Sequence, residues 1–165
     1  MAKRTITMRL GTSSIDSAIK ELNAYKKDLN HKVNTLIDAM VRYGEDYALN
    51  AVGHVRTGET LTTVVGYRRG NAGFVFAGGN AIWMEFGTGV RYNGPAGGSP
   101  HPKGKELGML IGEYGEGKGV NPNGWWYYDG EDVKHTYGIE ANMFMYKTAQ
   151  ELRRVYPELA KEVFG

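Results

Sequence analysis

The chain has 165 residues, of which 41% are hydrophobic and 23% are charged, the composition of one ordinary globular domain. It contains no cysteine, which excludes disulfide frameworks, thiolate metal sites and cysteine nucleophiles and fits a reducing compartment. A formal net charge of +2 is too balanced to indicate a dedicated nucleic-acid binder. No apolar run has the length that spans a membrane, and we expect no signal peptide.

The N-terminal third of the chain predicts a short strand followed by a long helix. Residues 5–10 alternate between apolar and polar, as in a strand. From Ile15 to Tyr47, apolar residues recur at three- and four-residue steps, which predicts one amphipathic helix from about Ser14 to Asn50. Two shorter helices folded back on each other are the alternative, and Gly44 could kink a single helix. A single helix would exceed what a small core covers, so we expect part of its apolar stripe to meet another chain.

Glycine marks the middle of the chain, because 21 of the 24 glycines lie between Gly53 and Gly138. This clustering predicts β structure with tight turns. Residues 61–67 and 74–76 are expected to form a hairpin, and the apolar run at 81–86 is read as part of the same β region. A long loop rich in glycine and proline follows, with one helical turn expected at 105–111.

The last third predicts a hairpin and a helix. Residues 125–128 and 133–137 flank Asp129-Gly130, which indicates a second hairpin with an aromatic face. Helical spacing returns at Phe144, and Pro157 is expected either to kink that helix or to start a new one. The predicted fold is therefore α+β: a short N-terminal strand, one long amphipathic helix, one small antiparallel sheet and a C-terminal helix. We expect a single domain over 1–165 with an extended loop insertion at about 89–124.

None of the motifs that resemble a catalytic or ligand site is complete. Residues 112–118 fit the first part of a phosphate-binding loop, but Gly119 stands where a serine or threonine is needed, so we read a glycine-rich surface loop. The four histidines lack metal-ligand spacing. Asp129, Glu131 and Asp132 cluster at a turn, where acidic residues are usually solvated. We therefore expect no enzyme activity, no cofactor and no metal.

The aromatic run Trp125-Trp126-Tyr127-Tyr128 presents two large rings to each face of a strand. Unless helices cover both faces, one face is exposed, and such residues are enriched in interface hot spots. Stacking on single-stranded nucleic acid is a further alternative, with Arg68 and Arg69 available in the first hairpin. The aromatic run itself lacks interleaved basic residues.

Three segments together form a recognisable pattern: Val55-Arg56-Thr57-Gly58, then 81–89 with its Glu85-Phe86-Gly87-Thr88 core, then 138–145. This pattern resembles the head–tail joining family of long-tailed bacteriophages, described as neck, minor tail or tail-completion proteins. The aromatic block at 124–130 is similar to members from phages of Gram-positive bacteria. Asn142-Met143 departs from the family's proline before the last helix, and Thr60 stands where a basic residue is frequent. The residues expected to carry the motif or the assembly are Arg56, Thr57, Gly58, Trp83, Glu85, Phe86, Gly87, Thr88, Gly89, Trp125, Trp126 and Phe144.

The resemblance implies a non-enzymatic virion component that forms a six- or twelve-fold ring at the head–tail junction, after assembly in the host cytoplasm. Its implied partners are copies of itself and the connector and tail tube proteins, with DNA only passing through the lumen and no membrane contact. Glu85 in an apolar run needs a partner, and Arg56 is our candidate. Gly87 and Gly89 permit a tight turn with positive φ. The long helix and the aromatic hairpin are candidate assembly surfaces. A nucleic-acid-binding module and a cell-wall hydrolase are the alternatives.

Overall fold

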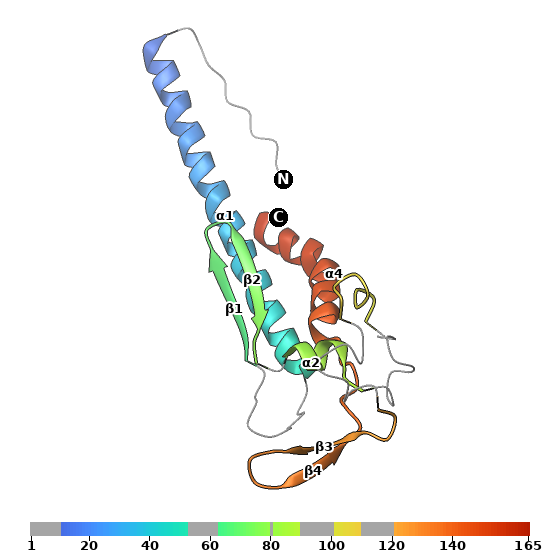
Figure 1. Ribbon diagram of the computed structural model, residues 1–165. Helices are drawn as coiled ribbons and strands as arrows, with labels where there is room; N and C mark the ends of the chain where they lie inside the picture. The colour runs from blue at the N-terminus through green and yellow to red at the C-terminus, as the bar shows by residue number, and fades with distance from the viewer. Residues whose placement is uncertain (1–10, 53–62, 80, 90–100, 110–120) are drawn as a thin grey trace.

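The computed structural model describes residues 11–52, 63–79, 81–89, 101–109 and 121–165. In chain order its elements are α1 (Thr12–Val52), β1 (Val64–Arg69), β2 (Ala72–Ala77), α2 (Ala81–Phe86), β3 (Trp125–Tyr128), β4 (Val133–Thr136) and α4 (Phe144–Phe164) (Figure 1). This order confirms the α+β class with a long first helix and a C-terminal helix. The strand predicted at 5–10 and the phosphate-loop-like segment at 112–119 lie outside the described residues.

α1 is one helix of 41 residues, about 60 Å long at 1.5 Å per residue, so the alternative of two shorter helices is wrong. Gly44 lies within it and does not end it. A Cβ atom at Gly44 would lie 2.9 Å from Cγ2 of Val75 and 3.1 Å from Cδ1 of Leu152. This glycine therefore lets β2 and α4 pack closely against α1.

α4 runs antiparallel to the C-terminal half of α1 (Figure 1). The side-chain amide of Asn142 donates to the carbonyl of Ala51 at 3.0 Å, and the Tyr43 hydroxyl donates to Glu151 at 2.7 Å. The helix continues past Pro157 to Phe164, so this proline does not start a new helix. With 21 residues, α4 is about half as long as α1, and the N-terminal half of α1 projects beyond it.

The β1–β2 hairpin lies along α1 and confirms the first predicted hairpin. Its two-residue turn begins at Gly70, whose φ of 61° suits the first central position of a type II′ turn. Gly66 and Gly73 face α1, where a Cβ atom would lie 2.8 Å and 2.5 Å from the methyl groups of Val41. Close backbone approach therefore requires glycine at both positions. Arg68 pairs with Asp38 of α1 at 2.9 Å and fixes the hairpin against the helix.

The second hairpin, β3–β4, is also confirmed, but it pairs only with itself. Within the described residues the four strands form two separate two-stranded sheets, so the prediction of one antiparallel sheet is wrong. Each hairpin is closed by its own tight turn, which sets its register locally and requires no pairing between hairpins. β3–β4 lies at the end of the molecule opposite the N-terminus of α1 (Figure 1).

Residues 81–86 form the short helix α2, so the β interpretation of this run is wrong. A six-residue apolar run is compatible with either structure, and the burial of Ala81, Met84 and Glu85 at helical spacing shows which one holds here. The expected helical turn near 105 begins earlier, since the Leu107 N–H donates to the Lys103 carbonyl at 3.0 Å. The core forms where α1, β1, α2 and α4 meet, from Ala48, Val64, Ala81, Met84 and Phe144.

Candidate assembly surfaces and the buried Glu85 network

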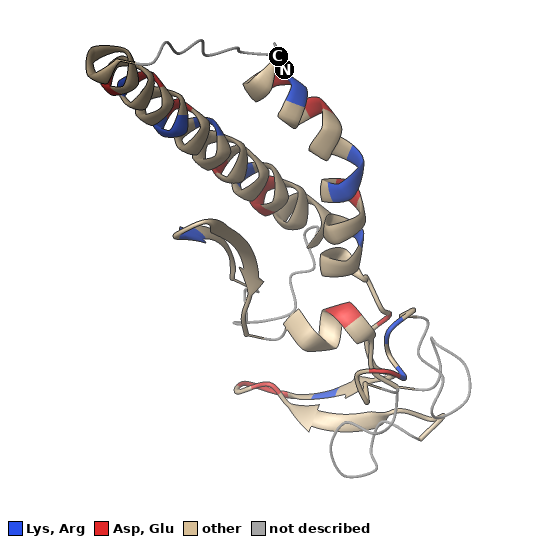
Figure 2. Ribbon diagram, turned by 90° about the horizontal axis from the view of Figure 1, so that it is seen from above, with Lys and Arg blue, Asp and Glu red and all other residues tan. Residues whose placement is uncertain are grey.

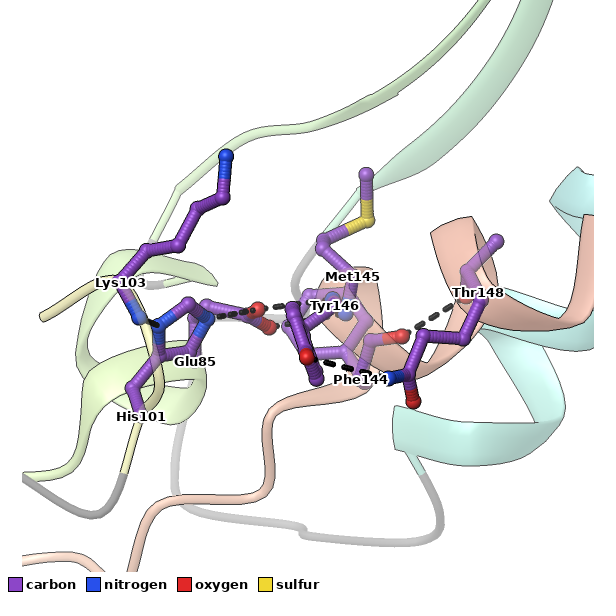
Figure 3. A network of polar contacts seen from close by, with 8 residues as sticks. Glu85, His101, Lys103, Phe144, Met145, Tyr146 and Thr148 are labelled. Carbon is purple, nitrogen blue, oxygen red and sulfur yellow. Dashed lines mark hydrogen bonds and ion pairs between the residues drawn. The ribbon is translucent and has the colours of Figure 1, made fainter. Parts of the chain in front are cut away.

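Glu85, one of the predicted site residues, carries a buried carboxylate, with 7% of its surface exposed. Its Oε2 accepts the backbone N–H of Met145 at 2.8 Å, and its Oε1 accepts that of Tyr146 at 2.8 Å (Figure 3). These N–H groups belong to the first turn of α4 and have no partner within the helix. Met143, at the N-cap position, has a left-handed φ of 56° and gives no side-chain cap. Glu85 therefore caps α4 from a different helix.

His101 completes this network. Its Nδ1 accepts the backbone N–H of Lys103 at 3.1 Å, and its Nε2 lies 3.0 Å from Oε1 of Glu85. Because Nδ1 accepts, the ring proton of neutral His101 sits on Nε2 and is donated to the carboxylate. The imidazole also packs 4.4 Å from the ring of Phe86 and 5.2 Å from that of Tyr146. His101 thus ties residues 101–109 to α2 and α4.

The expected partner of Glu85, Arg56, lies outside the described residues together with Thr57 and Gly58. Sequence reasoning missed His101, which stands sixteen residues from Glu85 in a segment without periodicity. It also missed the backbone donors, which no residue type marks. An unpaired buried carboxylate is energetically costly, so the sequence did indicate that Glu85 has hydrogen-bond donors, but it did not indicate which groups they are.

Thr88 joins the segment after α2 to the segment before α4. Its N–H donates to the Ile139 carbonyl at 2.7 Å, and the Ile139 N–H donates back to the Thr88 carbonyl at 3.1 Å. Gly87, Gly89 and Gly138 all have positive φ, and a Cβ atom at Gly138 would overlap the Thr88 carbonyl. The prediction of positive φ at Gly87 and Gly89 is confirmed, and the reason at Gly89 is close contact with the backbone of 137–138.

The remaining predicted residues divide between the interior and the surface. Phe86 and Phe144 are buried, and Trp83 and Trp125 are half-buried. Trp126 is 66% exposed. The motif residues on α2 and at the start of α4 therefore build one junction, whereas the Trp126 side chain belongs to an uncovered surface.

That surface, here named the aromatic face, consists of Trp126, Tyr128, Val133 and His135. Cross-strand pairing sets Trp126 opposite His135 and Tyr128 opposite Val133, so all four side chains project from one side of the hairpin. Tyr128 and Val133 are about as exposed as Trp126, and the His135 ring stacks edge-on against Trp126 at 4.9 Å. The alternative in which helices cover both sides of this hairpin is wrong within the described residues.

The β1–β2 hairpin carries a second uncovered surface, here named the outer face, formed by Val65, Tyr67, Phe74 and Phe76. Val65 pairs with Phe76, and Tyr67 pairs with Phe74, on the side of the hairpin away from α1. The rings of Tyr67 and Phe74 stack at 5.1 Å, and all four side chains are exposed. This surface was not predicted from the sequence, although large residues alternate with glycine in 64–76, which indicates one side with large side chains and one side without them.

The acidic cluster at 129–132 is a structural turn. Asp129 Oδ1 accepts the N–H of Asp132 at 2.8 Å and that of Glu131 at 3.0 Å, and its other oxygen forms an ion pair with Lys134. The backbone bond from Asp132, together with these other donors, holds the pKa of Asp129 well below its usual range. The described residues contain no cluster of three or more histidine or carboxylate side chains able to hold a metal ion.

An apolar cavity of about 270 Å³ lies between α1, β2 and α4. Its lining includes Met40, Val75 and Leu152, and the Thr148 hydroxyl beside it is already donated to the Phe144 carbonyl. Such a cavity can accept apolar groups but offers no reactive side chain.

Among the described helices, none is long and apolar enough to cross a membrane. Comparison of the chain with family models, curated proteins and solved structures finds no match.

Proposed function

We propose that this protein is a structural component of the head–tail junction of a long-tailed bacteriophage and that it assembles as a closed ring. The observation that carries the proposal is the presence of two separate uncovered apolar surfaces, the outer face and the aromatic face. Monomeric proteins rarely leave clustered large apolar side chains in water. The motif resemblance supplies the biological setting.

A ring needs two different interaction surfaces on each chain, because each head-to-tail contact joins one surface to the other. The outer face is a four-residue aliphatic and aromatic patch on β1–β2, and the aromatic face carries Trp126 and Tyr128 on a projecting hairpin. Because the two faces lie on different elements, one chain can use both at once. We infer that the aromatic face of one copy packs on the outer face of the next.

The contacts of the charged residues support this structural role over the alternatives. The Glu85 carboxylate is committed to the start of α4, and Asp129 is committed to its own turn. For a nucleic-acid-binding module, Arg68 would have to leave Asp38. A hydrolase that used Glu85 or Asp129 in catalysis would lose the hydrogen bonds with which they stabilise α4 or the turn. A nucleic-acid-binding surface would have few basic groups beside its aromatic rings.

Light scattering and negative-stain microscopy of concentrated protein test the ring, alone and with purified tail tubes or connectors. Rings of six or twelve copies, free or bound to those structures, are expected. Phe76→Ser and Trp126→Ser should each abolish closed rings. Tyr156→Ser, which removes an exposed ring from α4 outside both faces, is the control and should assemble normally.

Mixing the two variants tests the head-to-tail pairing. Each variant retains one intact face, so the mixture should form a single contact between hairpin faces and no closed ring. A concentrated wild-type monomer that binds neither tail tubes nor connectors would contradict the proposal. A gene position between portal or capsid genes and the major tail protein gene is the expected genomic setting.

A further inference from the structure

The uncovered half of α1 carries a coiled-coil seam. Apolar residues alternate at steps of four and three along the whole helix, with one lysine among them: Ile15, Ile19, Leu22, Lys26, Leu29, Val33, Leu36, Met40, Tyr43 and Tyr47. Strict alternation of these steps gives a mean period of 3.5 residues, which keeps one seam facing a partner helix over several heptads. α1 is thus patterned for helix pairing along its length.

Among the described elements, α4 covers only the second half of this seam. Tyr43 bonds to Glu151 of α4, and Leu36 is buried. In the first half Ile19 is 52% exposed and Leu22 is 56% exposed. Figure 1 shows that the N-terminal half of α1 extends beyond α4. The seam therefore runs continuously from the contact with α4 onto a stretch whose N-terminal residues no other described element covers.

We propose that residues 15–33 of α1 pair with the same residues of a second copy, as an antiparallel coiled coil. An antiparallel register in which paired residue numbers sum to 48 sets every seam residue against another. Ile15 then faces Val33 of the second copy, Ile19 faces Leu29, and Leu22 faces Lys26. Two-fold symmetry repeats these three layers, which gives six in all.

Lys26 selects the antiparallel arrangement. In a parallel, in-register pair Lys26 would face Lys26 of the second copy inside the seam, and like charges at such a position are strongly disfavoured. In the antiparallel pair its aliphatic stem lies over Leu22 and its ammonium group reaches solvent, as exposed lysines commonly do. One residue thus separates the two orientations.

The residues that flank the seam are compatible with this register. Lysines and acidic residues are interspersed along this half of α1 (Figure 2). In an antiparallel pair each flank of the seam meets the same flank of the second copy, so Asp16 lies near Asn30 and Lys32 lies near Ala18. No like charges meet on either flank, and each seam residue faces a seam residue of the second copy, which favours a second copy as the occupant.

The inference does not rest on the proposed ring, since it uses neither the outer face nor the aromatic face. The hydrogen bonds between α4 and α1 involve Tyr43 and Ala51, which lie beyond the paired segment 15–33. The antiparallel register therefore places these α4 contacts at opposite ends of the pair.

Sedimentation of the full chain over a range of concentrations tests the pairing. Ile19→Asp should lower the association constant by at least about tenfold. Ala24→Asp adds the same charge on the opposite side of the helix and should leave association unchanged, with equal helicity of both variants checked by circular dichroism. A dimer that Ile19→Asp does not weaken, or a chain that stays monomeric, overturns the proposal.

Cysteine cross-linking tests the orientation, because the natural chain has no cysteine. In the antiparallel pair position 19 lies opposite position 29, and about 15 Å along the axis from its own copy, too far for a disulfide. Mixed Ile19→Cys and Leu29→Cys proteins should cross-link to each other, and neither should cross-link to itself. Self-cross-linking of either variant, or no cross-linking in the mixture, refutes the antiparallel pair.

Discussion

Replacing Glu85 by glutamine tests the capping of α4, because the change keeps the size of the side chain and removes one acceptor and the charge. If the new amide nitrogen replaces Oε2, it faces the Met145 N–H. If it replaces Oε1, it faces the Tyr146 N–H and the His101 Nε2–H. His101 cannot relieve this by changing tautomer, since its Nδ1 accepts from Lys103. A donor therefore meets a donor in either orientation.

The expected cost follows from these contacts. A buried N–H left unpaired costs about 1–3 kcal/mol. Loss of a buried negative charge at a helix N-terminus adds roughly 0.5–2 kcal/mol. We therefore expect Glu85→Gln to lower the free energy of unfolding by about 3 kcal/mol. For a chain of this length each kcal/mol corresponds to roughly 2–4 °C, so Tm should fall by about 6–12 °C.

Urea unfolding followed by circular dichroism gives the free energy, with calorimetry for Tm. Glu158→Gln makes the same chemical change at an exposed position of α4 and should stay within about 0.5 kcal/mol of the wild type. His101→Phe keeps the ring contacts and removes the donor, so a double-mutant cycle with Glu85→Gln should show coupling of about 1 kcal/mol. A Glu85→Gln protein as stable as the Glu158→Gln protein would refute the capping argument.

Three further predictions concern close packing and charge. Gly138→Ala should cost at least about 3 kcal/mol in urea unfolding, because its Cβ atom would overlap the Thr88 carbonyl, whereas Gly130→Ala, at a similar positive φ in open space, should cost about 1–2 kcal/mol. Gly73→Ala should lower Tm, since its Cβ atom would press on Val41 and lift β1–β2 from α1, and an unchanged Tm would contradict this packing. The Arg154 guanidinium and the Tyr43 hydroxyl hold the pKa of Glu151 at about 2, below its usual 4.5. The folded value is the lower one, so this contribution to stability is present above pH 4.5 and is lost as the pH falls toward 2. The stability difference between wild type and Arg154→Gln should shrink across that window, and a constant difference would contradict the assignment.

The elements that the sequence predicted well are those with long or local signals. In α1, apolar residues recur at three- and four-residue steps from Ile15 to Tyr47, and each hairpin has its own turn residues, so periodicity and turn chemistry decide them. The run at 81–86 was misread because six residues cannot distinguish a strand from a helix. The separation of the hairpins was missed because the pattern within a strand says nothing about which strand pairs with it.

The Glu85 network shows a different limit. The apolar run around Glu85 indicated that its carboxylate needs hydrogen-bond donors. Two of the three donors are backbone N–H groups at the start of α4, and only the folded position of that helix brings them to Glu85. The departure at Asn142-Met143 has a local solution that the sequence did not reveal. Asn142 anchors to Ala51 and Met84, and Met143 adopts a left-handed conformation that turns the chain into α4.

The two proposed contacts have different symmetry, and their combination has a consequence for assembly. Heterologous packing of the hairpin faces closes a ring, whereas the antiparallel α1 pair is isologous and relates two copies by a two-fold axis. If both form together, two rings are joined face to face with dihedral symmetry. Because a head–tail junction has a single direction, the proposed function requires that such a pair of rings separate before one of them joins a tail. Ile19→Asp is therefore expected to give single rings in side views by electron microscopy where the wild type gives double rings. Double rings that persist in this variant would show that α1 is not the contact between them.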